Sequence, residues 1–141
     1  MKRVLMAGIG ALVAAFSLML LASCGESKDE GPPIQLQQTD RDSISQIART
    51  YVAALEANDT EGAQALLVDG VPKATVAKSI TTVKDEGFHL VSVGDATAVN
   101  GSNVEIQVAL TDKDGKSVTR KLEFRLDAGE WVVYSPHLKP L

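Results

Sequence analysis

The sequence is poor in the residues from which covalent, metal and catalytic sites are usually built. Of its 141 residues, one is cysteine, two are histidine and 4% are aromatic. A single cysteine excludes a disulfide framework within the chain and a zinc site made of several thiolates. Basic residues are fewer than acidic ones, 14 against 18, so we expect no nucleic-acid partner. The length is that of a single domain.

Much of the apolar sequence lies at the start of the chain. Lys2 and Arg3 precede a run from Val4 to Ala22 that contains no charged residue. A basic start, an apolar run and then small residues form the layout of a secretory signal peptide. The run is also long enough to span a bilayer, but a stop-transfer helix is normally followed by Lys or Arg, and the residues here are net negative. We therefore expect residues 1–23 to be a signal peptide.

The only cysteine of the chain lies directly after this leader. The tetrapeptide Leu21-Ala22-Ser23-Cys24 resembles the bacterial lipobox, in which an aliphatic residue and two small residues precede a cysteine. The resemblance implies that the Cys24 sulfur carries a diacylglycerol and that the leader is cut away before it. Two or three acyl chains, at about 0.8 kcal/mol per buried CH₂, give stable anchoring. The alternative is a signal anchor in which Cys24 has no role.

These features predict an exported lipoprotein, held by its lipid at the outer face of the bacterial cell membrane, or at the outer membrane if the host has one. After Cys24, residues 25–38 combine charge, two glycines and Pro32-Pro33 with only two aliphatic residues. Such a segment cannot bury enough apolar surface to fold, so residues 24–39 are expected to be the lipidated cysteine and a flexible tether. Alternatively, Ile34 and Leu36 begin a short edge strand.

Three amphipathic helices are expected next. Apolar residues recur at steps of three and four along the first helix, which Thr39 or Asp40 is expected to cap. A second helix is expected from Glu61 to Val68, ended by Gly70, and a third begins with Pro72 as its first residue and ends at Gly87. The apolar stripe of the first helix is Ile44, Ile47, Ala48, Tyr51, Val52 and Leu55.

From Phe88 the hydrophobic period changes from 3.6 to 2, which indicates strands joined by short turns. We expect a break at Gly94-Asp95 within the first strand. Helices followed by a meander indicate an α+β domain, with N-terminal helices packed on an antiparallel four-stranded sheet. This domain is expected to span residues 40–135, leaving 136–141 as a C-terminal tail. The expected strands lie within Phe88–Val99, Val104–Leu110, Val118–Leu126 and Trp131–Tyr134.

Two segments resemble the nuclear transport factor 2-like superfamily: the helix-ending sequence from Tyr51 to Asp59, and the last hairpin from Gly129 to Val133. An Ala/Leu-rich second helix adds to the likeness, which covers roughly Asp40 to Ser135 and is greatest to uncharacterised small lipoproteins. The resemblance implies a cystatin-like cone, in which a curved sheet wraps over helices. It implies no particular activity, because the superfamily includes isomerases, dehydratases, transport adaptors and modules without known chemistry.

Enzymes of this superfamily usually place an acid or base inside the cone, and the chain offers few candidates. His89 lies on the first strand and His137 in the tail, and nothing in the sequence pairs either with a carboxylate. Asp112, Asp114 and Glu123 have part of the spacing of a calcium loop, but the glycine required at its sixth position is missing. We therefore expect no catalytic residue, no metal site and no cofactor.

The function expected from the sequence is that of a non-catalytic binding module with an envelope protein or a small apolar ligand as its partner. Tyr51, His89 and Trp131 are the candidates for lining a ligand pocket at the mouth of the cone. The alternative is a cone-type enzyme or carrier for a small hydrophobic molecule, with His89 as the base of the enzyme. A third possibility is docking of a second copy on the outer sheet face. A monomer is expected, because this face is charged: it carries Glu105, Gln107, Lys121, Glu123 and Arg125.

Overall fold

A computed structural model describes residues 32–141, so the expected signal peptide, Cys24 and most of the tether lie outside the described residues. No helix among the described residues is long and apolar enough to cross a membrane. Helices precede strands along the chain, as expected. The helices are α1 (Gln38–Glu56), α2 (Thr60–Ala65) and α3 (Lys73–Glu86). The strands are β1 (His89–Asn100), β2 (Asn103–Thr111), β3 (Ser117–Asp127), β4 (Glu130–Val133) and β5 (Lys139–Pro140).

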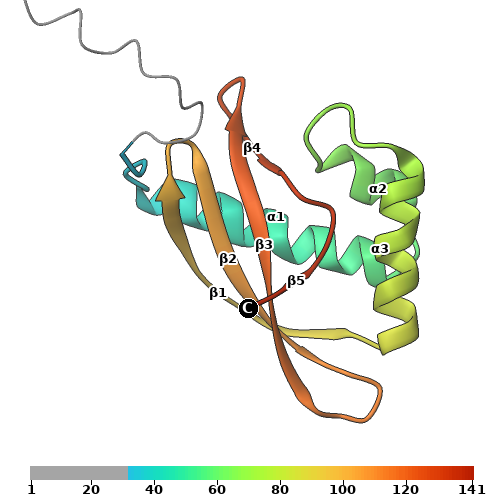
Figure 1. Ribbon diagram of the computed structural model, residues 1–141. Helices are drawn as coiled ribbons and strands as arrows, with labels where there is room; N and C mark the ends of the chain where they lie inside the picture. The colour runs from blue at the N-terminus through green and yellow to red at the C-terminus, as the bar shows by residue number, and fades with distance from the viewer. Residues whose placement is uncertain (1–31) are drawn as a thin grey trace, which may run out of the picture.

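The strands form one antiparallel sheet in the order β1-β2-β3-β4, and α1 runs across one of its faces (Figure 1). This confirms the α+β class and the four-stranded meander. The free edge of β3 is divided between two partners. Strand β4 pairs with Phe124–Asp127, and β5 pairs with Arg120 and Lys121 further along β3. The expected tail therefore contributes a short fifth strand to the sheet.

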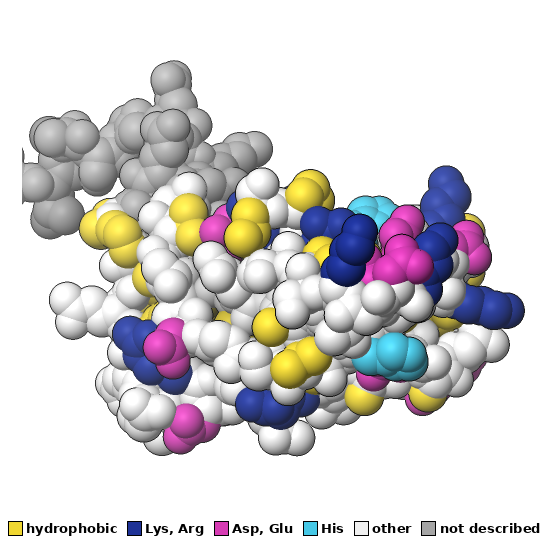
Figure 2. Space-filling model, turned by 90° about the horizontal axis from the view of Figure 1, so that it is seen from below, with side chains coloured by type: hydrophobic (Ala, Val, Ile, Leu, Met, Phe, Trp, Pro, Cys, Tyr) yellow, Lys and Arg dark blue, Asp and Glu magenta, His cyan; other side chains and the backbone are white. Residues whose placement is uncertain are grey.

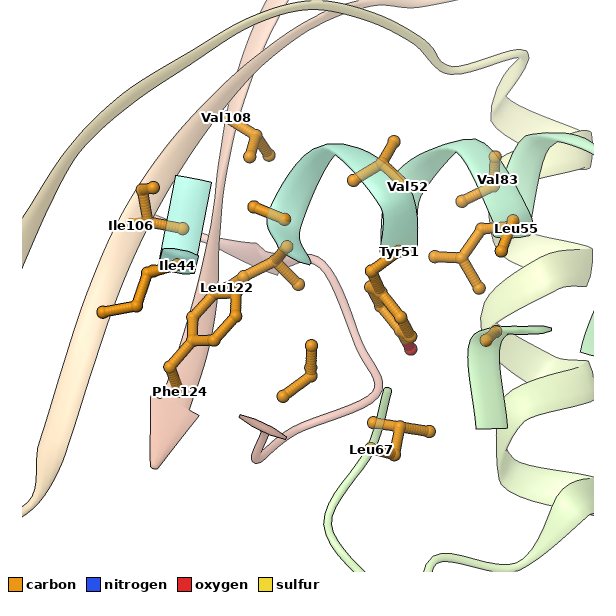
Figure 3. Close-up of a cluster of buried hydrophobic side chains, with 14 of the residues drawn as sticks. Ile44, Tyr51, Val52, Leu55, Leu67, Val83, Ile106, Val108, Leu122 and Phe124 are labelled. Carbon is orange, nitrogen blue, oxygen red and sulfur yellow. The ribbon is translucent and has the colours of Figure 1, made fainter. Parts of the chain in front are cut away.

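The core lies between α1 and the inner face of the sheet (Figure 3). Alternate residues of β2 are buried, as the period of two predicts, and they face the apolar stripe of α1. Each fully buried aliphatic side chain contributes about 1.5–3 kcal/mol to folding. The side chains with at most 1% exposure at this interface include Ile44, Tyr51, Val52, Leu55, Val104, Ile106, Val108, Leu110, Leu122 and Phe124.

Strand β1 lies at the edge of the sheet, and the two ends of α1 hold it there. The register between β1 and β2 shifts between Val93 and Ala96, which confirms the predicted break. The Arg41 Nη1 donates a hydrogen bond to the carbonyl of Ala96 at 2.7 Å, and the backbone N–H of Leu90 donates to Glu56 Oε1 at 3.0 Å. Side chains of α1 thus satisfy backbone groups on a strand that has a sheet neighbour on one side only.

The first helix and the folded region begin earlier than expected. Gln37, and not Thr39 or Asp40, occupies the N-cap of α1, and its backbone N–H donates to Asp40 Oδ2 at 2.9 Å. Ile34 forms no strand, but its N–H donates to the Gly101 carbonyl at 3.2 Å, and it packs with Leu36 against the core. The domain boundary expected at residue 40 is therefore too late, because two isolated aliphatic residues give no periodic signal.

Helix α2 is shorter than expected because the residues that follow it form backbone hydrogen bonds with the end of β4. It ends at Ala65 instead of Val68, and Gly70 lies in the turn beyond and does not end the helix. The N–H of Val133 donates to the Leu66 carbonyl at 2.8 Å, and the N–H of Val68 donates to the Val133 carbonyl at 2.9 Å. These tertiary hydrogen bonds replace the last turn of the helix.

Helix α3 is bounded by residues suited to helix ends. Pro72, expected to be the first helical residue, instead takes the N-cap, and the helix begins one position later at Lys73. Gly87 ends the helix in the left-handed region with φ 63°, as expected. A Cβ at this position would come within 2.7 Å of the Lys113 Cβ and 3.0 Å of its Cα, so the hairpin between β2 and β3 approaches Gly87 closely.

Replacing Gly87 by alanine is expected to destabilise the domain by more than the cost of positive φ alone. That cost is roughly 1–2 kcal/mol for a residue with a Cβ. The matched control is Gly115→Ala, where φ is 75° but no atom lies within 4 Å of the new Cβ. Urea unfolding of both variants measures the difference. Equal losses in the two variants would contradict the close packing at Gly87.

Candidate functional site

The interior of the cone is filled with apolar side chains. Among the described residues, the only polar side chain in the buried class besides the Tyr51 phenol is that of Ser79. An enzyme of the cone type needs an acid or a base there, and the described interior supplies neither a carboxylate nor a histidine. The hollows described below are open to the surface of the domain.

Tyr51 is sealed inside this core. Its side chain has no exposed surface, and its hydroxyl donates a hydrogen bond to the Pro136 carbonyl at 2.7 Å. Burial raises the pKa of the Tyr51 phenol above its ordinary value, which keeps it protonated as a donor. The sequence suggested that the Tyr51 hydroxyl could contact a ligand, but in the structure it bonds to the C-terminal segment of the chain.

The residues after β4 contact both the helices and the sheet. His137 Nδ1 lies 2.9 Å from the hydroxyl of Ser79 on α3, and Lys139 Nζ donates to Glu123 Oε2 on β3 at 2.6 Å. Together with the Tyr51 bond, these contacts tie the segment to α1, α3 and the sheet. His137 and Ser79 are 58 positions apart, and no sequence signal links them.

Trp131 lies at the beginning of α1. Its indole Nε1 donates to Asp40 Oδ1 at 3.0 Å, beside an open hollow of about 590 Å³ that Ile47 also lines. The pKa of Asp40 is lowered, first by this hydrogen bond and then by the one from the Gln37 backbone. The tryptophan thus serves as a partner for the capping carboxylate of the helix.

His89 lies at the other end of α1, beside Glu56. Glu56 is about 24 Å along the helix axis from Asp40, the partner of Trp131. Its side chain is 77% exposed, and Nδ1 lies 3.2 Å from Glu56 Oε1, the oxygen that also accepts the Leu90 N–H. Histidine side chains reach the surface on the face shown in Figure 2, where acidic and basic groups lie beside one another. The sequence did not reveal the Glu56 partner, because 33 positions separate the two residues.

A hollow of about 350 Å³ lies beside His89, between the ends of α1 and α3 and the start of β1. Its floor is apolar and its rim carries the charged side chains of Glu56 and Lys84 as well as the imidazole. Trp131 borders a different hollow and Tyr51 is sealed, so the structure does not bring the three expected pocket residues together. The floor consists of Leu55, Ile80, Val83 and Phe88.

The carboxylates of the sheet and hairpin have structural partners. Glu105 and Glu123 lie directly opposite one another, and Lys121 Nζ donates to Glu105 Oε1 at 2.9 Å. The Glu105 hydrogen bond and charge raise the pKa of Lys121. Glu123 instead pairs with Lys139 of the tail. Asp112 Oδ1 accepts two backbone N–H groups of its own turn, so its role here is that of a turn residue.

The fold has counterparts among solved structures. A protein of unknown function with a cystatin-like fold from Nostoc punctiforme is 14% identical, with a TM-score of 0.52, over 72% of this chain and 91% of that one. A provisionally assigned aromatic ring hydroxylase from Novosphingobium aromaticivorans is 17% identical, with a TM-score of 0.49, over 72% and 88%. No family model and no curated protein matches the chain. The first likeness confirms the cystatin-like fold and, at this identity, shows the fold alone.

Substituting Tyr51 by phenylalanine is expected to loosen the C-terminal segment. The buried Pro136 carbonyl would lose its donor, at a cost of about 1–2 kcal/mol in the free energy of unfolding. Hydrogen exchange should rise at residues 136–141. Tyr134→Phe is the control, because the ring over Arg125 would remain and Tyr134 is 44% exposed. Equal stability of wild type and Tyr51→Phe would contradict a role for this bond.

The Asp40 carboxylate is expected to favour the folded state at neutral pH. Because its folded pKa lies below the ordinary value of 3.8, this contribution is present above pH 3.8 and is lost as the pH falls through the lower, folded pKa. Trp131→Phe removes the main cause, so the carboxyl pKa measured by NMR should rise. Ser43→Ala alters the same hollow but leaves the hydrogen bond from Trp131 to Asp40 in place, so the pKa of Asp40 should be unchanged. An unchanged pKa in Trp131→Phe would refute the assignment.

Proposed function

We propose that the protein is a lipid-anchored lipoprotein of the bacterial cell envelope, whose domain acts as a binding module without chemistry of its own. The observation that carries this proposal is the position of the only cysteine, Cys24, directly after Leu21-Ala22-Ser23 and a 19-residue stretch without charge. An acylated cysteine at this place would hold the domain at the membrane surface.

The geometry of the domain fits an anchor at its N-terminal side. Its first core contacts are made by Ile34 and Leu36, so a short segment separates them from Cys24. A flexible coil of the nine residues between Cys24 and Ile34 would span about 16 Å. The beginning of α1 would then lie nearer the bilayer, and the hollow beside His89 would lie at the far end of α1, open to the aqueous side.

A filled interior favours binding over catalysis. The buried groups of the cone pack against one another, and the buried hydroxyls of Tyr51 and Ser79 bond to the chain's own C-terminal segment. A partner would therefore meet the domain on its surface. The second candidate function is that of a carrier for a small hydrophobic ligand, and the apolar-floored hollow beside His89 is the observation that favours it.

Replacing Cys24 by alanine in the full chain, expressed in its own host, is expected to abolish acylation and leave the leader uncut. Metabolic labelling with an alkyne fatty acid, followed by mass spectrometry of the N-terminal peptide, measures both. The control is Ser23→Ala, which keeps a small residue before the cysteine and should retain the label. Since the chain has no other cysteine, an acylated Cys24→Ala protein would overturn the proposal.

A further inference from the structure

We propose that the hollow beside His89 binds a small apolar molecule that carries one anionic group, such as a medium-chain carboxylate, and that Lys84 is the partner of its charge. This inference rests on the proposed binding function and names the chemistry of its ligand. It concerns a surface hollow, not the interior of the cone.

The floor of the hollow provides an apolar contact surface from three elements. Leu55 comes from the end of α1, Ile80 and Val83 from α3, and Phe88 from the chain just before β1. These side chains belong to the core and are held in place by it, so the floor is already formed without a ligand. A volume of about 350 Å³ is at the small end of the range found for ligand sites.

The charged groups on the rim differ in whether they have partners. Glu56 Oε1 already accepts the Leu90 N–H and lies beside His89 Nδ1. Lys84 is exposed in the last turn of α3, and its ammonium group has no ion pair or side-chain hydrogen bond within residues 32–141. Of the charged residues that line the hollow, Lys84 is thus the one whose charge is left unpaired in the described structure.

The surroundings favour an anion over a cation. The guanidinium of Arg120 lies 5.5 Å from the centre of the Phe88 ring, which places a second positive charge close to the floor. The carbonyls of Val83 and Lys84, at the negative end of α3, already accept the N–H groups of Phe88 and Gly87. A ligand cation would meet the Lys84 ammonium, whereas a carboxylate would pair with it and leave its apolar body over the floor.

The test uses the full, lipidated protein in nanodiscs of zwitterionic lipid. A photoreactive decanoate is the probe, and the corresponding photoreactive decanol is the neutral comparison. Mass spectrometry maps the crosslinks, and the expected result is labelling within residues 80–89 by the carboxylate, several times stronger than by the alcohol. Labelling elsewhere on the domain, or equal labelling by both probes, would overturn the inference.

Two lysine variants distinguish a specific ion pair between Lys84 and the probe from a general effect of positive charge on α3. Lys84→Ala should reduce crosslinking by up to about fivefold, the upper end of what loss of one exposed ion pair gives. Lys78→Ala is the matched control: it is exposed on the same helix but does not line the hollow, so crosslinking should be unchanged. Equal effects of the two variants would refute the role of Lys84. Acylation of Cys24 is read in the same sample, so loss of the anchor and loss of ligand binding are distinguished.

Discussion

The packing of one helix stripe on one sheet face is the interaction on which the rest of the structure depends. The apolar side of α1 covers the alternate buried residues of β2 and β3, and this contact removes both surfaces from water. Once α1 lies across the sheet, Arg41 and Glu56 at its two ends reach backbone groups of β1. The position of the edge strand, and with it the place of His89, follows from the position of the helix.

The same packing fills the described interior of the cone with apolar side chains, so neither a carboxylate nor a histidine is buried there. Large side chains fill the space between helix and sheet, and Tyr51, the largest of them, directs its hydroxyl to the carbonyl of Pro136. A buried hydroxyl without a partner is costly, so a position that could hold a ligand group holds the chain's own C-terminal segment. A cystatin-like fold therefore says little about chemistry here, and function must be argued from the surface.

The side-chain surroundings differ between the two ends of α1. At the beginning of α1, the Trp131 indole and the Gln37 backbone N–H donate hydrogen bonds to the Asp40 carboxylate, which stabilises the start of the helix. At the end of α1, core side chains form the floor of a surface hollow, and Lys84, which has no charge partner within residues 32–141, lies on its rim.

Much of the fold could be predicted from the sequence, because period and turn residues are local properties. The stripe from Ile44 to Leu55 and the alternation on β2 were enough to predict helix, strand and α+β class, and the Gly94-Asp95 break was correctly placed. The leader and the acylation of Cys24 remain predictions, because these residues lie outside the described part of the chain. What the sequence left open was decided by contacts between distant residues. The pairing of His89 with Glu56, of Ser79 with His137 and of Tyr51 with Pro136 spans 33 to 85 positions. No local pattern encodes such distances. Only the packing of α1 and α3 against the sheet brings these groups together. This packing buries Tyr51 in the core and leaves His89 on the rim of a surface hollow.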